Sequence, residues 1–201
     1  NLTSGTIYNQ FDRTLNSCDD TIRMATSQQR GEPLHIGVDF NVNNMSAIFH
    51  VYRGGEPRAV AELVGVRDTP ALIELIKGQY EGHDITIYPD ASGASANSTN
   101  ASISDLSLLR EHFRVDAPKA NPRVRERVVS VNAMFCNAKG ERRYKVNVKA
   151  CPTYVQDLEQ LAYDKHGEPD KTSGNDHRPD AAGYFIHRKH AARGKPKVTI
   201  R

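Results

Sequence analysis

The chain has few of the features that mark a disulfide-stabilised, zinc-binding or membrane protein. Its three cysteines are scattered along 201 residues and form no CxxC pair: Cys18, Cys136 and Cys151. This argues against a disulfide framework and a cysteine-rich zinc site, and it favours a reducing compartment. No apolar run approaches the length of a membrane span, and no charged-then-apolar leader opens the chain. We therefore expect neither membrane insertion nor secretion.

A nucleotide-binding signature is also missing. No GxxxxGK[ST] phosphate loop occurs anywhere in the chain, which argues against a P-loop ATPase site in this sequence. The length fits one domain with appended tails. The chain begins with Asn1 rather than methionine, and we interpret it as a piece of a longer protein.

The net charge of +3 conceals a strong asymmetry. Residues 119–149 carry nine Lys/Arg against two Glu, a net charge of +7, and residues 187–201 add six Lys/Arg and no acid. The remainder of the chain is therefore acidic, with a net charge of −10. Segregation of this kind favours a polyanionic partner, although a solvated basic face is the commoner explanation of any single charge run.

One segment, LHIGVDFN at residues 34–41, reads as a central strand that carries a carboxylate. Leu34, Ile36, Val38 and Phe40 alternate with His35, Gly37, Asp39 and Asn41, so one face is apolar throughout. A charged carboxylate beside a core costs several kcal/mol unless it is hydrogen-bonded, paired or bound to metal. Asp39 therefore requires a partner.

Two other acids have a similar setting. Asp90 ends the apolar segment ITIYPD, and Asp180 lies in DHRPD, which opens the last predicted helix. Three such carboxylates could meet around a divalent ion, since Mg²⁺ and Mn²⁺ prefer oxygen ligands. Taken alone, Asp90 is also a common turn former, and we interpret Asp176 as the N-cap of the helix rather than as a ligand.

The pattern predicts a mixed α/β fold. Three antiparallel strands are expected over residues 34–41, 45–52 and 58–64, then a helix from Thr69-Pro70, and then a strand over 84–89 parallel to the first. Further helices should contain Leu106, follow an Asn121-Pro122 cap, begin at Pro152 and begin near Asp176. A short strand is expected at residues 113–116 and a hairpin over 136–148.

This order of elements, together with LHIGVDFN, ITIYPDASG and NDHRPDAAGYF, resembles a known family. It is similar to the C-terminal nuclease domain of the large terminase subunit of tailed, double-stranded DNA bacteriophages, most of all those that package by the headful mechanism. The resemblance covers residues 34–190. It implies a ribonuclease H-like (resolvase/integrase-type) mixed central sheet flanked by helices. Residues 1–33 are then an N-terminal arm or a linker from a preceding ATPase domain, and residues 191–201 a basic C-terminal tail.

The resemblance also implies a function. The domain is expected to be a metal-dependent endonuclease that cuts concatemeric viral DNA at the initiation and termination of packaging. The resemblance assigns the three acids of the family to Asp39, Asp90 and Asp180, and a histidine near the last acid to His177. Mg²⁺ or Mn²⁺, as two ions about 4 Å apart, would be the cofactor. The implied partners are double-stranded DNA, an ATPase motor domain, the small terminase subunit and the portal protein, in the host cytoplasm during virus assembly.

Two further predictions come from the residues themselves. Glu62 lies near the end of a predicted strand, beside the expected site, and is a candidate additional metal ligand, against an ordinary surface role. Lys139, Arg142, Arg143 and Lys145 form a basic segment that could follow the DNA backbone, against a solvated hairpin.

Three alternatives remain open from the sequence. IGVDFN superficially resembles the first phosphate loop of actin-like and sugar-kinase ATPases, but that fold needs a second, duplicated domain. Other nucleases of the same fold, such as junction resolvases and transposases, would share the acids. A DNA-binding module without catalysis would share the basic segments.

Overall fold

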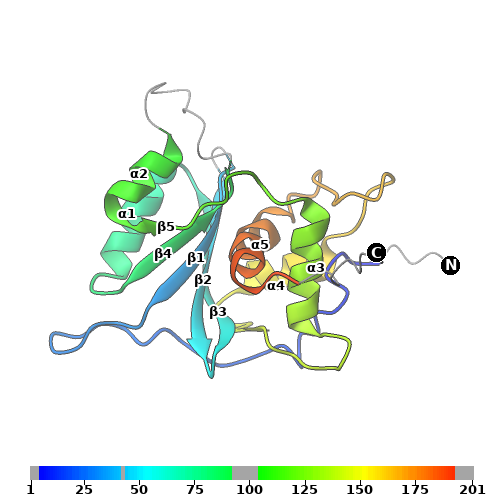
Figure 1. Ribbon diagram of the computed structural model, residues 1–201, viewed down its shortest axis with the longest axis horizontal. Helices are drawn as coiled ribbons and strands as arrows, with labels where there is room; N and C mark the ends of the chain where they lie inside the picture. The colour runs from blue at the N-terminus through cyan, green and yellow to red at the C-terminus, as the bar shows by residue number, and fades with distance from the viewer. Residues whose placement is uncertain (1–4, 42–43, 92–103, 193–201) are drawn as a thin grey trace, which may run out of the picture.

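The computed structural model describes residues 5–41, 44–91 and 104–192. Within them, one mixed six-stranded sheet lies between two layers of helices (Figure 1). The elements in chain order are β1 (Leu34–Asp39), β2 (Met45–Arg53), β3 (Glu56–Val66), α1 (Thr69–Gln79), β4 (Ile85–Pro89), α2 (Asp105–His112), β5 (Arg114–Val115), α3 (Val124–Phe135), β6 (Lys145–Val146), α4 (Pro152–Gln160) and α5 (His177–His190). In these residues no helix has both the length and the apolarity needed to cross a membrane.

The predicted pairing of the first four strands is confirmed. The strand order is β5-β4-β1-β2-β3-β6, with β1, β2 and β3 antiparallel and β4 parallel to β1. The parallel pair requires a crossover, which α1 supplies. Asp68 begins this helix by accepting a hydrogen bond from the Ala71 N–H at 2.9 Å, and Pro70 occupies the first turn. Parallel β4 ends beside β1, so Asp39 and Asp90 lie at the same edge of the sheet.

The alternation along β1 distributes its side chains between two cores. Leu34, Ile36 and Val38 belong to the core under α1 and α2 on one face of the sheet. On the other face, His35, Gly37 and Asp39 meet α5: His35 stacks on Phe185, Gly37 lies against Ala181, and Asp39 contacts His177. Every second residue of β1 therefore meets every fourth residue of α5. This spacing places the first turn of α5 beside the end of β1.

The first described residues, 5–18, pack on the α3–α4–α5 side of the sheet. Ile7 and Tyr8 are buried in that core, and the Ile7 N–H donates to the Leu161 carbonyl at 2.9 Å. Asn16 is fully buried and donates to the carbonyls of Phe135 and Tyr144. Residues 5–18 are thus built into this core by apolar burial and by hydrogen bonds.

The hairpin predicted over residues 136–148 is wrong. Residues 137–140 do turn, with the Asn137 N–H donating to the Glu141 carbonyl at 3.1 Å. The chain then folds back on the end of α3, where the N–H groups of Arg143 and Tyr144 both donate to the Met134 carbonyl. In this region β6 is a short strand parallel to β3. The alternation of Tyr144 and Val146 reflects burial against the core, not pairing within a hairpin.

Candidate metal centre

The three acids predicted from the sequence line one cleft. Asp39 ends β1, Asp90 follows β4, and Asp180 lies in the first turn of α5. The cleft has a volume of about 670 Å³, and its other lining residues are Phe40, Asn41, Asn121, Pro122, Arg123, Val124, Arg127, Lys171, Asp176, His177 and Tyr184. Strand ends and a helix start meet here because α5 crosses the sheet at β1 and brings its first turn to the edge where β1 and β4 end.

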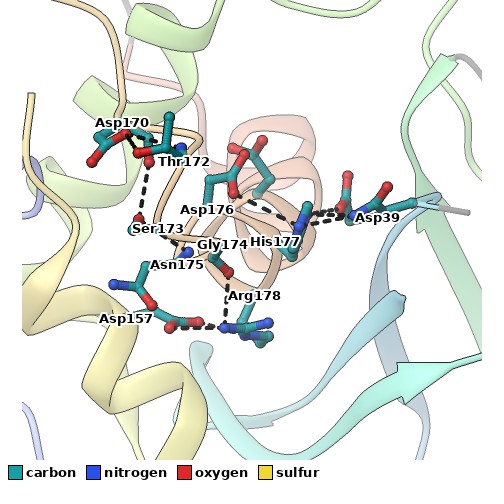
Figure 2. Close-up of polar contacts among 12 residues, drawn as sticks. Asp39, Asp157, Asp170, Thr172, Ser173, Gly174, Asn175, Asp176, His177 and Arg178 are labelled. Atoms are coloured by element: carbon teal, nitrogen blue, oxygen red, sulfur yellow. Dashed lines mark hydrogen bonds and ion pairs between the residues drawn. The ribbon is translucent and has the colours of Figure 1, made fainter. Parts of the chain in front are cut away.

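His177 holds Asp39. Its Nδ1 donates to Asp39 Oδ2 at 3.0 Å (Figure 2). Its Nε2 lies 2.9 Å from the Asn41 amide nitrogen. The hydrogen bond to Asp39 raises the pKa of His177, and the charges of Asp176 and Asp39 raise it further, against the lowering effect of burial. The ring is thereby fixed between two residues of the β1 end.

Arg127 holds Asp180. This arginine, only 4% exposed, donates from Nη2 to Asp180 Oδ1 at 2.8 Å and stacks over the Tyr184 ring at 4.5 Å. Its Nη1 also donates to the Pro122 carbonyl. Desolvation raises the pKa of Asp180, whereas Arg127 lowers it. In the sequence Arg127 is only one member of a basic stretch, because its partner Asp180 lies 53 residues away.

Asn121 fixes the backbone beside Asp90. The sequence predicted Asn121 as a helix cap, but Arg123 is the N-cap residue of α3. The Asn121 side chain instead accepts a hydrogen bond from the Ala91 N–H at 2.6 Å. The segment leading into α3 therefore supports two of the three acids, Asp90 through Asn121 and Asp180 through Arg127.

A buried ion pair anchors the start of α5. Arg178 Nη2 donates to Asp157 Oδ1 of α4 at 2.9 Å and to the Gly174 carbonyl of the preceding loop (Figure 2). The Asp157 carboxylate is almost fully buried, so the pair replaces hydration with a charge-assisted hydrogen bond. It sets the position of His177 and of the loop that carries Lys171.

Asp176 takes the N-cap position of α5, but its side chain does not cap the described helix. It is 6% exposed, and Oδ1 makes no hydrogen bond to any residue that the structure describes. Nε2 of His177 lies 3.8 Å from this oxygen. The predicted N-cap position of Asp176 is confirmed, but its side chain accepts no hydrogen bond from the first turn of the helix.

Comparison with known proteins gives the family. A family model described as the terminase RNase H-like domain matches residues 36–189. The chain belongs to this terminase domain family. A search of curated proteins finds no match.

Solved terminase structures share the fold. The large terminase of a thermophilic bacteriophage aligns over 94% of this chain and 46% of its own, with a TM-score of 0.69 and 20% identity. The nuclease domain of the P22 large terminase aligns over 94% of this chain and 96% of its own, with a TM-score of 0.59 and 18% identity. The large terminase nuclease domain of bacteriophage SPP1 with bound Mn aligns over 78% and 86%, with a TM-score of 0.51 and 20% identity.

This terminase domain thus spans about half the length of the thermophilic-phage protein and nearly all of the P22 nuclease domain. At these identities the likeness shows a shared fold. The predicted ribonuclease H-like architecture is confirmed.

Glu62 lies outside the cleft of this terminase domain. Its Oε1 accepts from the Thr153 N–H at 2.9 Å and its Oε2 from the Tyr154 N–H at 2.8 Å. These N–H groups belong to the first turn of α4, where Pro152 supplies no N–H of its own. Glu62 therefore caps α4 from a neighbouring strand, which its position at a predicted strand end gave no means of foreseeing.

The predicted basic segment comes after the C-terminal end of α3, whereas the N-terminal end of α3 lines the cleft. Val124 and Arg127, near the start of α3, line the cleft, whereas Lys139, Arg142, Arg143 and Lys145 come after its last residue. Because α3 has 12 residues, its two ends are about 18 Å apart. Arg142 is also engaged within the fold, donating from Nη1 to Asn16 Oδ1 at 2.6 Å and to the Gln10 carbonyl at 3.0 Å.

The donor set of the cleft suits the divalent ions that the family implies. Asp39, Asp90, Asp176 and Asp180 offer carboxylate oxygens, the ligands that Mg²⁺ and Mn²⁺ prefer, and one of these oxygens is buried without a hydrogen-bond partner among the described residues. In the same residues, no three His, Cys, Asp or Glu side chains already form a metal-binding group. Asp39 and Asp180 are instead engaged by His177 and Arg127.

Proposed function

We propose that this domain is a divalent-metal-dependent endonuclease that cuts concatemeric viral double-stranded DNA at the initiation and termination of genome packaging. The observation that carries the proposal is the convergence of Asp39, Asp90 and Asp180 on one cleft from three elements distant in sequence. Membership of the terminase RNase H-like family supports it, as does the Mn bound in the SPP1 nuclease domain.

Asp39, Asp90 and Asp180 are the residues that would hold Mg²⁺ or Mn²⁺, two ions in our proposal. The bound ions would supply a nucleophile from water and stabilise the charge that develops on the phosphate and the leaving oxygen. Arg127 orients Asp180 and favours its charged form, and His177 orients Asp39 through Nδ1. The ring of His177 is held beside the acids, within reach of a scissile phosphate or its attacking water.

The DNA backbone is the substrate group that meets this cleft. Arg123 and Lys171 line it, and both are exposed, so they are available to phosphate. We retain Lys139, Arg143 and Lys145 as proposed contacts for a more distant part of the duplex. Contacts of this kind add affinity that falls with salt and little sequence preference, which suits a cutter of headful ends.

The other partners are proposed for the longer protein of which this chain would be a part. They are an ATPase motor domain, the small terminase subunit and the portal protein, acting in the host cytoplasm during virus assembly. The thermophilic-phage large terminase, which was also solved in complex with ADP, is about twice as long as the part that matches this chain.

Cleavage of supercoiled plasmid in Mn²⁺ tests the function. We expect nicking and linearisation by the wild-type domain, loss of both with EDTA, and loss in Asp39→Asn, Asp90→Asn and Asp180→Asn with unchanged circular dichroism. Asp19→Asn, at an exposed acid, is the control and should cleave normally. DNA binding without Mn²⁺-dependent nicking would favour a non-catalytic module, and preference for a four-way junction over plasmid would favour a resolvase.

A further inference from the structure

We propose that Asp176 is a fourth carboxylate of the metal centre and contributes ligand oxygen to a bound divalent cation. This inference rests on the proposed metal-dependent function and adds a residue to it. Neither the resemblance nor the sequence pattern assigns Asp176 such a role, since an aspartate directly before a helix is ordinarily its N-cap.

The first observation is burial without a partner. Asp176 is 6% exposed, lines the cleft, and leaves Oδ1 without a hydrogen bond to the described residues. A buried carboxylate oxygen in that condition is costly, and native structures keep such groups rarely. A cation in the cleft would provide the compensation that the protein atoms do not.

The second observation is where the unpartnered atoms gather. Within the described residues, three buried side-chain atoms lack a hydrogen-bond partner: Ser46 Oγ, Arg127 Nε and Asp176 Oδ1. Arg127 and Asp176 line the cleft, and Ser46 lies directly opposite Asp39 in the β1–β2 ladder. Directly opposed residues project to the same face of a sheet. The unmet hydrogen-bonding capacity is therefore concentrated at one site, as expected where ions and their bound waters belong.

The third observation is the charge around the cleft. Asp39 is paired with His177 and Asp180 with Arg127, but the only ion-pair contact of Asp176 among the described residues is His177 Nε2, 3.8 Å from Oδ1. His177 already donates to Asp39. The Asp176 charge is thus poorly compensated in a cleft that three other acids line, a condition that a divalent ion would relieve.

Substitution by asparagine and by serine tests metal binding by Asp176 separately from any effect on the helix N-terminus. Both residues are good N-caps, and neither carries a charge. If Asp176 binds the cation, Asp176→Asn and Asp176→Ser should weaken Mn²⁺ binding about 10- to 100-fold by isothermal titration calorimetry. In EDTA, both variants should unfold at the wild-type temperature or above it, because a buried, poorly compensated charge is removed.

Two further variants complete the design. Asp180→Asn is the reference for loss of a proposed ligand, and Asp19→Asn removes one exposed charge as the matched control. Wild-type Mn²⁺ affinity in both Asp176 variants, alongside weakened binding in Asp180→Asn, would overturn the role of Asp176 alone. If the wild-type domain does not bind Mn²⁺, or Asp180→Asn binds as tightly as wild type, the proposed function itself fails.

Discussion

Gly37 of β1 lies directly against the carbonyl group of Ala181 in α5, so closely that a Cβ atom at position 37 would overlap the Ala181 oxygen. Only glycine permits this approach of helix to sheet. Gly37 lies two residues before Asp39 in the strand, and Ala181 directly follows Asp180 in the helix. The distance between two of the proposed metal ligands therefore depends on a residue that carries no functional group.

Gly37→Ala should consequently disturb both the fold and the site. We expect a loss of more than about 2 kcal/mol of unfolding free energy, because backbone must move to admit the methyl group. Urea denaturation measures this. Gly78→Ala is the control, since a methyl group on Gly78 of α1 would point into open space, and it should be neutral or stabilising by up to about 1 kcal/mol. Equal stability of Gly37→Ala and wild type would contradict the close packing of α5.

Arg127→Met should be strongly destabilising, by about 3 kcal/mol, because it leaves the Asp180 carboxylate without its buried cation. The double variant Arg127→Met/Asp180→Asn should recover part of that loss, since the uncompensated charge is gone. A double-mutant cycle from urea denaturation in EDTA gives the coupling energy. Arg125→Met, at an exposed position of the same helix, serves as the control. Strict additivity of the two single changes would argue against a direct pairing.

Glu62→Ala should lower stability by about 1 to 2 kcal/mol through loss of the α4 cap, while leaving metal binding intact. Glu62→Gln keeps an acceptor oxygen and should fall between Ala and wild type. Thermal unfolding and Mn²⁺ titration calorimetry distinguish the two roles. A weakened Mn²⁺ affinity in Glu62→Ala at unchanged stability would restore Glu62 as a candidate ligand.

Arg142 and Arg143 should behave differently although they are adjacent. Arg142→Ala should destabilise the domain by about 1 to 3 kcal/mol, because the Gln10 carbonyl loses the Arg142 donor and Asn16 Oδ1 keeps only the Asp12 N–H. Arg143 is exposed, so Arg143→Glu should leave stability nearly unchanged while it weakens DNA binding and flattens its salt dependence. Fluorescence anisotropy across a salt series measures the slope. The wild-type slope in Arg143→Glu would remove this segment from the DNA interface.

His50 makes the domain sensitive to acid. Burial lowers the pKa of His50 to about 3, and its Nδ1 donates to the His35 carbonyl while Nε2 accepts from the Tyr144 hydroxyl. In the unfolded chain the pKa is about 6.5. Between these values the unfolded state binds a proton that the folded state does not, so stability falls with decreasing pH by up to about 1.4 kcal/mol per unit.

His50→Gln removes that titration and should flatten the fall in unfolding free energy between about pH 7 and pH 5, measured by urea denaturation. His166→Gln, at an exposed histidine, is the control and should follow the wild-type curve. Parallel curves for His50→Gln and wild type would contradict a neutral, buried His50.

Local pattern in the sequence was enough to predict most elements and to single out three acids that line one cleft. The alternation in residues 34–41 separated a core face from a functional face, and the Thr69-Pro70 start identified the crossover helix that makes β4 parallel to β1. Periodicity and capping report on burial and on helix ends within a few residues. They could not predict the course of residues 136–148, because burial against α3 and strand pairing produce the same alternation.

By itself, then, the sequence determined which carboxylates follow strands and open helices, and hence which of them could reach a shared edge of the sheet. Only the tertiary structure decided that Arg127 pairs with Asp180 and that Glu62 and Arg142 make hydrogen bonds that support the fold. It also decided that Asp176 is buried with one carboxylate oxygen lacking a hydrogen-bond partner among the described residues. The reason is physical. Arg127 and Asp180 meet across 53 residues because α3 packs on α5, and no local pattern encodes the packing of two distant helices.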